Sequence, residues 1–314
     1  MSLPAEARAA LAAFGLAEAR AELHSHRENR VFAVQDGPRR LALRLHRPGY
    51  HGEPELQAEL EFMAHLRAGG LRVPAPVAAP DGRLLVEAGG LFADLLEWLP
   101  GAPLGRSCVP LGLPEPEARA LFRALGAEAA RLHDAADRWP GAGRFARPAW
   151  DAGGLAGEAP LWGRFWDNPA LRPEERALLG EARTRARAAL AAAGPVDMGP
   201  IHGDLVRENV LVADGALALI DFDDCGPGYR LFEIATILHP NRDEPDYPAL
   251  RDAVLEGYDA LRPLSGAALA LLPVLQFLRA ASYVGWIMSR REVPGMAARE
   301  RRFIERACAL ADGI

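Results

Sequence analysis

Three side chains whose oxygen atoms suit phosphate and metal chemistry lie close together between Ile201 and Gly226. The stretch reads I-H-G-D-L-V-R-E-N-V-L-V-A-D-G-A-L-A-L-I-D-F-D-D-C-G and contains Asp204, Asn209 and Asp221. Carboxylate and amide oxygens are ligands that Mg²⁺ prefers, together with phosphate oxygens. Two such ligands beside a spare carboxylate suit phosphoryl transfer, in which Asp204 takes the proton of an attacking hydroxyl while Asn209 and Asp221 hold the metal.

The elements around these residues predict how they come together. Val210 to Val212 and Leu217 to Ile220 are typical of two short strands, and Asp214-Gly215 is typical of the tight turn between them. A hairpin of this length returns its two ends to the same side, so the three oxygen ligands are expected to converge. An ordinary acidic hairpin with a capped loop is the alternative interpretation.

Two motifs in this stretch resemble the catalytic hairpin of kinase-like phosphotransferases, the superfamily of aminoglycoside phosphotransferases and choline kinases. They are the H-G-D-x-x-x-x-N of residues 202–209 and the I-D-F of residues 220–222. The chain most resembles stress response kinase A and homoserine kinase type II, over essentially its whole length. The resemblance implies an α+β, bilobal protein-kinase-like fold, with a small β-rich N-lobe over 1–99 and a larger, mainly helical C-lobe over 100–314. It also implies ATP and Mg²⁺ as cofactors.

An alternating strand places Ala42 and Arg44 on one face and three leucines on the other. Ala42 and Arg44 match the A-x-K spacing of the resembled kinases, which implies that Ala42 covers the adenine and Arg44 pairs with phosphate. Arginine replaces the usual lysine, but a guanidinium keeps the charge and can bind phosphate bidentately. Glu59 in the next helix is the expected ion-pair partner, with Glu55 and Glu61 as rivals. A solvent-facing strand arginine is the alternative.

The place of the phosphate-covering loop is taken by Ser25 and the E-N-R-V of residues 28–31, without a glycine. This segment resembles the form in stress response kinase A, which implies that Ser25 and Asn29 supply the donors to phosphate. A polar hairpin turn is the alternative. Glu97 and Leu99 stand in the place of the hinge between the lobes, whose backbone groups would contact the adenine edge. An ordinary exit from a strand is the competing interpretation.

Four further residues near the motif are assigned by resemblance. Arg207 occupies a D-x-x-R position that homoserine kinase type II also has, which implies contact with the γ-phosphate; a surface arginine is the alternative. His202 is expected to pack beneath the loop, and His133 is expected to be structural. Glu233 replaces the aspartate that usually braces the catalytic loop.

The chain has 314 residues, a net charge of −6 and three widely spaced cysteines. This length predicts two lobes or domains, and the interspersed charges argue against nucleic acid as a partner. The cysteine pattern argues against a disulfide framework and favours the cytoplasm. Every basic side chain is arginine, which excludes a Walker A loop and Schiff-base chemistry.

No secretory signal is visible at the N-terminus. The most apolar stretch, residues 267–288, is interrupted by Pro273, Gln276 and Arg279, so we expect no membrane span and no membrane partner. A monomer is the default expectation for the oligomeric state. Hydrophobic periodicity predicts further elements. The expected helices are 5–13, 53–68, 115–133, 174–193, 248–261, 266–291 and 296–311, and the expected strands of the first lobe are 41–46, 73–78, 83–87 and 91–96.

The leading hypothesis is a kinase that phosphorylates a hydroxyl of a small molecule such as an amino alcohol, a sugar or an aminoglycoside. A Ser/Thr protein kinase resembling stress response kinase A is the first alternative. A nucleotide-binding pseudokinase is the second, because the glycine loop is missing and arginine replaces lysine. Asp223 and Asp224 could add to the metal shell or attract an amine-bearing substrate, or could form local caps and salt bridges.

Overall fold

Short strands in the first third of the chain and long helices thereafter give a mixed α+β architecture. The computed structural model describes residues 3–26, 29–292 and 295–314. It divides the chain into two compact units, each built from three segments. The first unit is Met1–Ala102, Arg138–Arg147 and Leu211–Asp223, and the second is Pro103–Asp137, Pro148–Val210 and Asp224–Ile314.

The first unit contains a five-stranded antiparallel sheet with the strand order β1-β2-β3-β5-β4. Leu41, Leu43 and Leu45 point to one face, where they join the apolar core, as their alternation predicted. The strands are β1 (Arg20–His26), β2 (Arg30–Asp36), β3 (Arg39–Leu45), β4 (Leu85–Ala88) and β5 (Leu91–Glu97).

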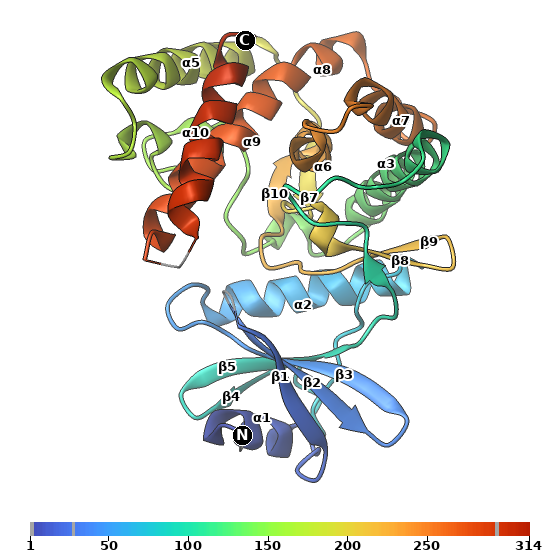
Figure 1. The fold of residues 1–314 in the computed structure, drawn as a ribbon. Helices are drawn as coiled ribbons and strands as arrows, with labels where there is room; N and C mark the ends of the chain where they lie inside the picture. Colours follow the sequence, from blue (N-terminus) through green and yellow to red (C-terminus); the bar gives the residue numbers. More distant parts are fainter. Residues whose placement is uncertain (1–2, 27–28, 293–294) are drawn as a thin grey trace. The chain divides into compact units, whose positions relative to one another are not determined.

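Two helices lie on opposite faces of this sheet (Figure 1). The helix α1 (Ala5–Ala13) packs Ala7, Ala10 and Leu11 into the core beneath the leucine face. The helix α2 (Glu53–Ala68) begins with a capping interaction, because the backbone N–H of Gly52 donates to Glu55 Oε2 at 2.7 Å. Both helices have the predicted bounds.

The strand predicted over residues 73–78 is absent from the described structure, where this segment is extended and makes one isolated bridge, from Pro76 to Leu96. Pro74 and Pro76 have no N–H to donate, so a continuous ladder cannot form. The prediction of a strand over residues 73–78 was therefore wrong, because its two prolines interrupt the hydrogen-bond pattern. The strand predicted over 83–87 is present as β4.

The predicted hairpin is confirmed as β8 (Val210–Ala213) and β9 (Ala216–Leu219), which form a three-stranded sheet with β6 (Ala102–Pro103). Its turn has positive φ at Asp214 (51°) and Gly215 (74°), the conformation that a two-residue hairpin loop requires. In the first unit, Leu219 N–H donates to Arg72 O at 2.9 Å. The later segments of the chain are therefore integral to this unit.

Aromatic packing joins the three segments of the first unit. The Phe62 ring of α2 lies 5.0 Å from Trp139, 5.2 Å from Phe145 and 6.2 Å from Phe222 between ring centroids. Trp139 and Phe145 come from the second segment and Phe222 from the third. Phe62, from the first segment of this unit, thus packs against rings from both of the other segments.

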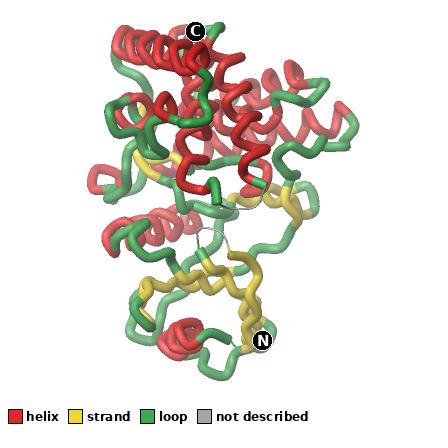
Figure 2. The backbone as a smooth tube through the Cα atoms, turned by 60° about the vertical axis from the view of Figure 1, so that its left-hand side comes forward, coloured by secondary structure: helices red, strands yellow, loops and turns green. Residues whose placement is uncertain are grey.

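Helices, red in Figure 2, make up most of the second unit. Two strands, β7 (Met198–Ile201) and β10 (Gly226–Tyr229), pair antiparallel on either side of the motif region. The helices α3 and α7 approach closely, because a Cβ on Gly126 would lie 2.1 Å from the carbonyl oxygen of Val254. The helices are α3 (Glu115–Asp137), α4 (Ala152–Ala156), α5 (Pro173–Ala192), α6 (Arg230–Leu238), α7 (Tyr247–Asp259), α8 (Gly266–Ala270), α9 (Leu272–Trp286) and α10 (Met296–Ala311).

The helix predicted over residues 266–291 is two helices, α8 and α9. Pro273 lies in the first turn of α9, where a missing N–H is tolerated, whereas inside a continuous helix it would break the hydrogen-bond pattern. Among the described residues, no helix is both long enough and apolar enough to cross a membrane.

Candidate active site

The loop between β7 and β8 places Asp204 and Asn209 in direct contact in the second unit. Asn209 Nδ2 donates to the Asp204 carboxylate oxygen Oδ2 at 3.0 Å and to the Asp204 carbonyl oxygen at 2.9 Å. A single turn of 3-10 helix (Arg207–Asn209) brings the two residues together. Because the amide nitrogen makes both bonds, the amide oxygen of Asn209 is the atom that could bind a metal.

Glu233 of α6 braces this loop, as its place in the sequence predicted. Its Oε2 accepts the backbone N–H of His202 at 2.5 Å and that of Gly203 at 3.4 Å. Glu233 is fully buried, and burial raises its pKa to about 7, although the two N–H donors favour the charged form. The longer side chain thus performs the bracing expected of aspartate.

The two histidines of this region are structural, in agreement with the prediction. His202 is fully buried, and its Nδ1 accepts the Asp204 backbone N–H at 3.3 Å. His133 is also fully buried, and its Nδ1 lies 2.8 Å from the hydroxyl of Tyr258. Burial lowers the pKa of His133, aided by the nearby guanidinium of Arg230, so the neutral ring is favoured.

Asp221 follows β9 in the first unit, and its side chain is exposed. Its φ of 66° is left-handed, which is unusual for a residue other than glycine and typical of functional positions. Asp223, two residues further, is buried and accepts a hydrogen bond from Asn29 Nδ2 at 3.1 Å. The metal-binding role of Asp221 stays a prediction.

Arg44 forms the predicted ion pair with Glu59 inside the first unit. Its Nη1 lies 2.8 Å from Glu59 Oε1, and both side chains are nearly or completely buried. Arg44 also binds Asp94 bidentately, with Nε 2.9 Å from Oδ1 and Nη2 2.8 Å from Oδ2. The identity of the partner is confirmed, and contact of Arg44 with phosphate stays a prediction.

Asp94 is a residue that the sequence reasoning missed. It lies directly opposite Arg44 in the ladder of β3 and β5, and His46 Nε2 lies 2.6 Å from its Oδ2. Burial disfavours the carboxylate, but Arg44 and His46 hold its pKa down at about 2. The available signal was an acidic residue within an otherwise apolar strand.

The residues predicted to cover the phosphates and adenine all lie in the first unit. Asn29 uses both ends of its amide within the protein, since its Oδ1 accepts the Arg47 backbone N–H at 3.2 Å. Ser25 is half-buried at a register shift in β1, and Ala42 is half-buried opposite Ala33 in β3. Residues 27 and 28 of this segment lie outside the described residues.

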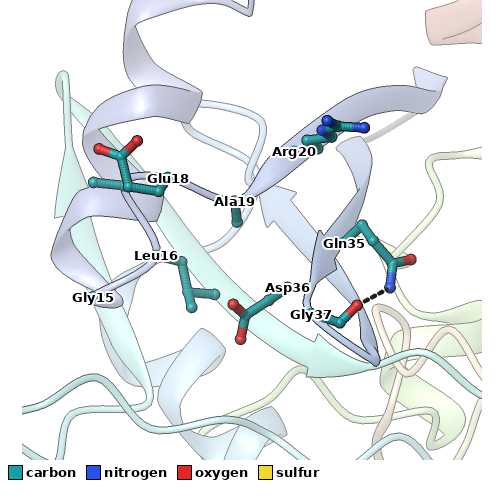
Figure 3. Close-up of a pocket in the computed structure, with 9 residues that line it drawn as sticks. Gly15, Leu16, Glu18, Ala19, Arg20, Gln35, Asp36 and Gly37 are labelled. Atoms are coloured by element: carbon teal, nitrogen blue, oxygen red, sulfur yellow. Dashed lines mark hydrogen bonds between the residues drawn. The ribbon is translucent and has the colours of Figure 1, made fainter.

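At the predicted hinge, Glu97 donates its backbone N–H to Ala75 O at 2.8 Å and pairs its carboxylate with Arg67 at 2.9 Å. Leu99 is buried in a small cluster with Leu211 and Ala218. A hollow of about 440 Å³ lies elsewhere in this unit, between the start of β1 and the turn after β2. Its lining residues are drawn in Figure 3. None of the predicted nucleotide-binding residues is among those that line it.

Arg207 is buried, and its side chain is held within the second unit. Its guanidinium donates to Asn241 Oδ1 at 2.7 Å and to the Val109 carbonyl at 2.7 Å, and it pairs with Glu244 at 2.6 Å. These contacts connect the catalytic loop to two other segments. Contact of Arg207 with the γ-phosphate stays a prediction.

Aromatic side chains surround Asp224 in the second unit. Trp150 Nε1 donates to the Asp224 carbonyl at 2.8 Å, and Trp162 Nε1 lies 3.4 Å from its carboxylate oxygen Oδ1. The Trp162 ring lies 5.4 Å from that of Tyr283 and 6.3 Å from that of Trp286. The guanidinium carbon of Arg279 lies 4.7 Å from the Trp162 ring and 4.6 Å from the Tyr283 ring, so these rings already contact a cation.

A small N-terminal antiparallel sheet with a buried, ion-paired strand arginine, a larger helical part, and an aspartate–asparagine loop are together typical of kinase-like phosphotransferases. The family model described as the phosphotransferase enzyme family matches residues 20–267. The chain therefore belongs to the phosphotransferase enzyme family, a family of kinases, and has the kinase-like fold that its motifs predicted.

Individual proteins extend this comparison. The structure of a microcompartment-associated aminopropanol kinase is 31% identical, with a TM-score of 0.84 over 98% of this chain and 95% of that one. A homoserine kinase of Acidiphilium cryptum is 36% identical over 226 residues, 69% of this chain and 64% of that protein's length. An amicoumacin kinase in complex with AMP-PNP and Ca²⁺ shares the fold at 19% identity, with a TM-score of 0.74 over 92% of this chain and 88% of that one.

Proposed function

We propose that this protein transfers the γ-phosphate of ATP, with Mg²⁺, to the hydroxyl of a small amino alcohol. The observation that carries the proposal is the Asp204–Asn209 pair, in which one amide nitrogen fixes the carboxylate at 3.0 Å and leaves the amide oxygen for a metal. The similarity to an aminopropanol kinase over nearly the whole chain supports this class of acceptor.

The donor set of Asn209 and Asp221 fits Mg²⁺, because it offers one amide oxygen and one exposed carboxylate. Within the described residues, no group of three or more His, Cys, Asp and Glu side chains could hold a metal. In this proposal the metal has two protein ligands, and phosphate oxygens and water would complete its shell. Bound Mg²⁺ would neutralise charge on the phosphates during transfer.

In the proposed reaction, the acceptor oxygen forms a bond to the γ-phosphorus as the bond to the β–γ bridging oxygen breaks. ADP leaves, and the hydroxyl proton goes to the Asp204 carboxylate. The nucleotide would be bound by side chains and backbone groups of the first unit, and Glu59 would orient one of them, Arg44. The binding residues would be Ser25, Asn29, Ala42, Arg44, Glu97 and Leu99.

Charge in the second unit favours an acceptor that carries an ammonium group. Asp204 forms an ion pair with the guanidinium of Arg279, and Asp224 adds a second carboxylate beside Trp162 that also interacts electrostatically with Arg279. Burial raises the pKa of the neighbouring Glu233, which reduces its share of the negative charge. In this proposal the Asp224 carboxylate binds the ammonium group while the hydroxyl faces Asp204.

The test compares aminopropanol with propane-1,2-diol, which keeps the hydroxyl and lacks the ammonium group. Ethanolamine, homoserine, an aminoglycoside and casein complete the panel, with labelled ATP as the donor. We expect aminopropanol to exceed the diol in kcat/KM by about 100-fold, since one charge-assisted contact contributes about 2–3 kcal/mol. Asp224→Asn should remove most of that difference.

Asp204→Asn is the matched variant for the chemistry, and it should lower kcat by about 10²–10⁴-fold. Label that enters only casein would show a protein kinase instead. ATP binding without turnover of any acceptor would show a pseudokinase. Equal use of aminopropanol and the diol would refute the role of the ammonium group.

A further inference from the structure

Arg279 is a fully buried arginine in the middle of the apolar helix α9. A buried guanidinium costs several kcal/mol of solvation unless its charge and its donors are satisfied. Its contacts in the folded chain indicate a more specific role.

The guanidinium reaches from α9 to the catalytic loop. Its Nη2 hydrogen bonds to and forms an ion pair with Asp204 Oδ1, and its Nη1 lies 3.3 Å from the Gly203 carbonyl oxygen. Nη2 also donates to the Tyr283 hydroxyl at 2.8 Å, one turn further along the same helix. The rings of Trp162 and Tyr283 lie 4.7 and 4.6 Å from the guanidinium carbon.

Together with Asn209, this contact fixes both oxygens of the Asp204 carboxylate. Arg279 binds Oδ1 and Asn209 Nδ2 binds Oδ2 at 3.0 Å. A carboxylate held on both oxygens cannot rotate about its terminal torsion, which is otherwise soft. The direction in which Asp204 presents its remaining lone pairs is thus set by a helix far along the chain.

A purely structural role for Arg279 does not explain why its guanidinium contacts the catalytic loop. The helix α9 is already anchored by fully buried apolar residues, including Leu275, Phe277 and Leu278. Buried ion pairs add little stability compared with apolar residues of similar size. Both hydrogen bonds that the guanidinium makes beyond its own helix are with Gly203 and Asp204 of the H-G-D motif.

We propose that Arg279 is a positioning residue, which orients the Asp204 carboxylate toward the acceptor hydroxyl. The inference rests on the proposed function, in which Asp204 takes the hydroxyl proton. It adds a residue from α9 to the machinery of that reaction. Arg279 itself needs no contact with substrate.

The experiment is a double-mutant cycle on the full-length protein with ATP and aminopropanol. Arg279→Met should lower kcat by about 100-fold, because a displaced reacting group costs that much, and should leave KM for ATP within about 3-fold. In the Asp204→Asn background, the same substitution should cost less than about 3-fold, since its target is already gone. Arg279→Lys keeps the charge and should recover about 10-fold over Arg279→Met.

Arg262→Met is the matched control, because Arg262 is also an ion-paired arginine of the second unit. It pairs with Asp134, Asp137 and Asp197 at 3.0, 2.6 and 3.0 Å. It should lower thermal stability without changing kcat. Thermal unfolding of every variant checks the fold, and if Arg279→Met does not fold, Arg279→Lys against wild type and against Asp204→Asn completes the cycle.

Two results would overturn the inference alone: a folded Arg279→Met variant with kcat within about 3-fold of wild type, or equal costs in both backgrounds. Full activity in Asp204→Asn would instead overturn the proposed function and this inference with it. If Asp204→Asn loses activity and Arg279→Met lowers kcat by the same factor in both backgrounds, the role of Arg279 is refuted but the proposed function stands.

Discussion

The carboxyl group of Glu233 gives the sharpest test of the structure, because its pKa is raised from 4.5 to about 7 by burial. Below pH 4.5 the group is protonated in both the folded and the unfolded chain, so it does not affect the free energy of unfolding. As pH rises from 4.5 through about 7, the unfolded chain loses this proton first, and the folded state is destabilised. The full penalty is about 3 kcal/mol, and it is reached above the folded pKa.

Glu233→Gln carries no ionisable group and should escape this penalty. Its unfolding free energy, measured with urea, should gain on that of the wild type by about 2 kcal/mol between pH 5 and pH 8. The amide oxygen can still accept the N–H groups of His202 and Gly203, so the brace of the loop is retained. Other groups cancel in the comparison, except His133, whose Nε2 lies 3.8 Å from Glu233 Oε2.

A direct measurement removes that ambiguity. The carboxyl carbon of Glu233, identified in a ¹³C spectrum as the signal missing from Glu233→Gln, should titrate near pH 7. Parallel stability curves for the two proteins, or a carboxyl signal that titrates below pH 5, would refute the reasoning. Either outcome would mean that the two N–H donors outweigh burial at this site.

Three other substitutions test separate parts of the structure. Arg44→Met should lower the free energy of unfolding by about 3–5 kcal/mol, because the buried carboxylates of Asp94 and Glu59 lose the cation that they share and keep only His46 and Arg147 as partners, whereas Arg44→Lys should lose less in the same urea titration. Asp223→Ala should weaken binding of a non-hydrolysable ATP analogue by about 5-fold, since it releases the amide of Asn29, and Asp223→Asn, which keeps an acceptor, should not; equal affinities would exclude this role. Gly126→Ala should cost about 1–3 kcal/mol through a clash with α7, and Gly180→Ala in α5, where a Cβ meets nothing within 4 Å, should not lower the melting temperature.

Local patterns predicted much of the fold correctly. The alternation of Leu41, Leu43 and Leu45 predicted their common core face, and the Asp214-Gly215 turn predicted the hairpin, because both depend on neighbouring residues only. The strand predicted over residues 73–78 was wrong, because Pro74 and Pro76 lack the N–H groups that a strand needs, although the other side chains of the segment favour β structure. The helix predicted over 266–291 was too long because the missing N–H of Pro273 was not considered. Pro273 lies in the first turn of α9, so the helix begins there and α8 ends before it.

Site residues that belong to a sequence motif could be predicted. Site residues that are brought in only by tertiary packing could not. The Arg44–Glu59 pair followed from spacing that resembles kinases. Asp94 and Arg279 join the site only through strand register and through the approach of a distant helix. Both are charged residues within apolar segments, and that anomaly is the signal by which they could have been found.

The first unit draws its core from three separate stretches of sequence, and this limits how the gene can be recombined. Phe62 packs against rings from residues 139, 145 and 222, so a single crossover near codon 100 would give it foreign neighbours. Productive chimeras between relatives would need to inherit Arg138–Arg147 and Leu211–Asp223 from the same parent as the N-terminal segment. Recombination between relatives is thus expected to have exchanged the two units rarely, so that members of the family diverged mainly by point changes.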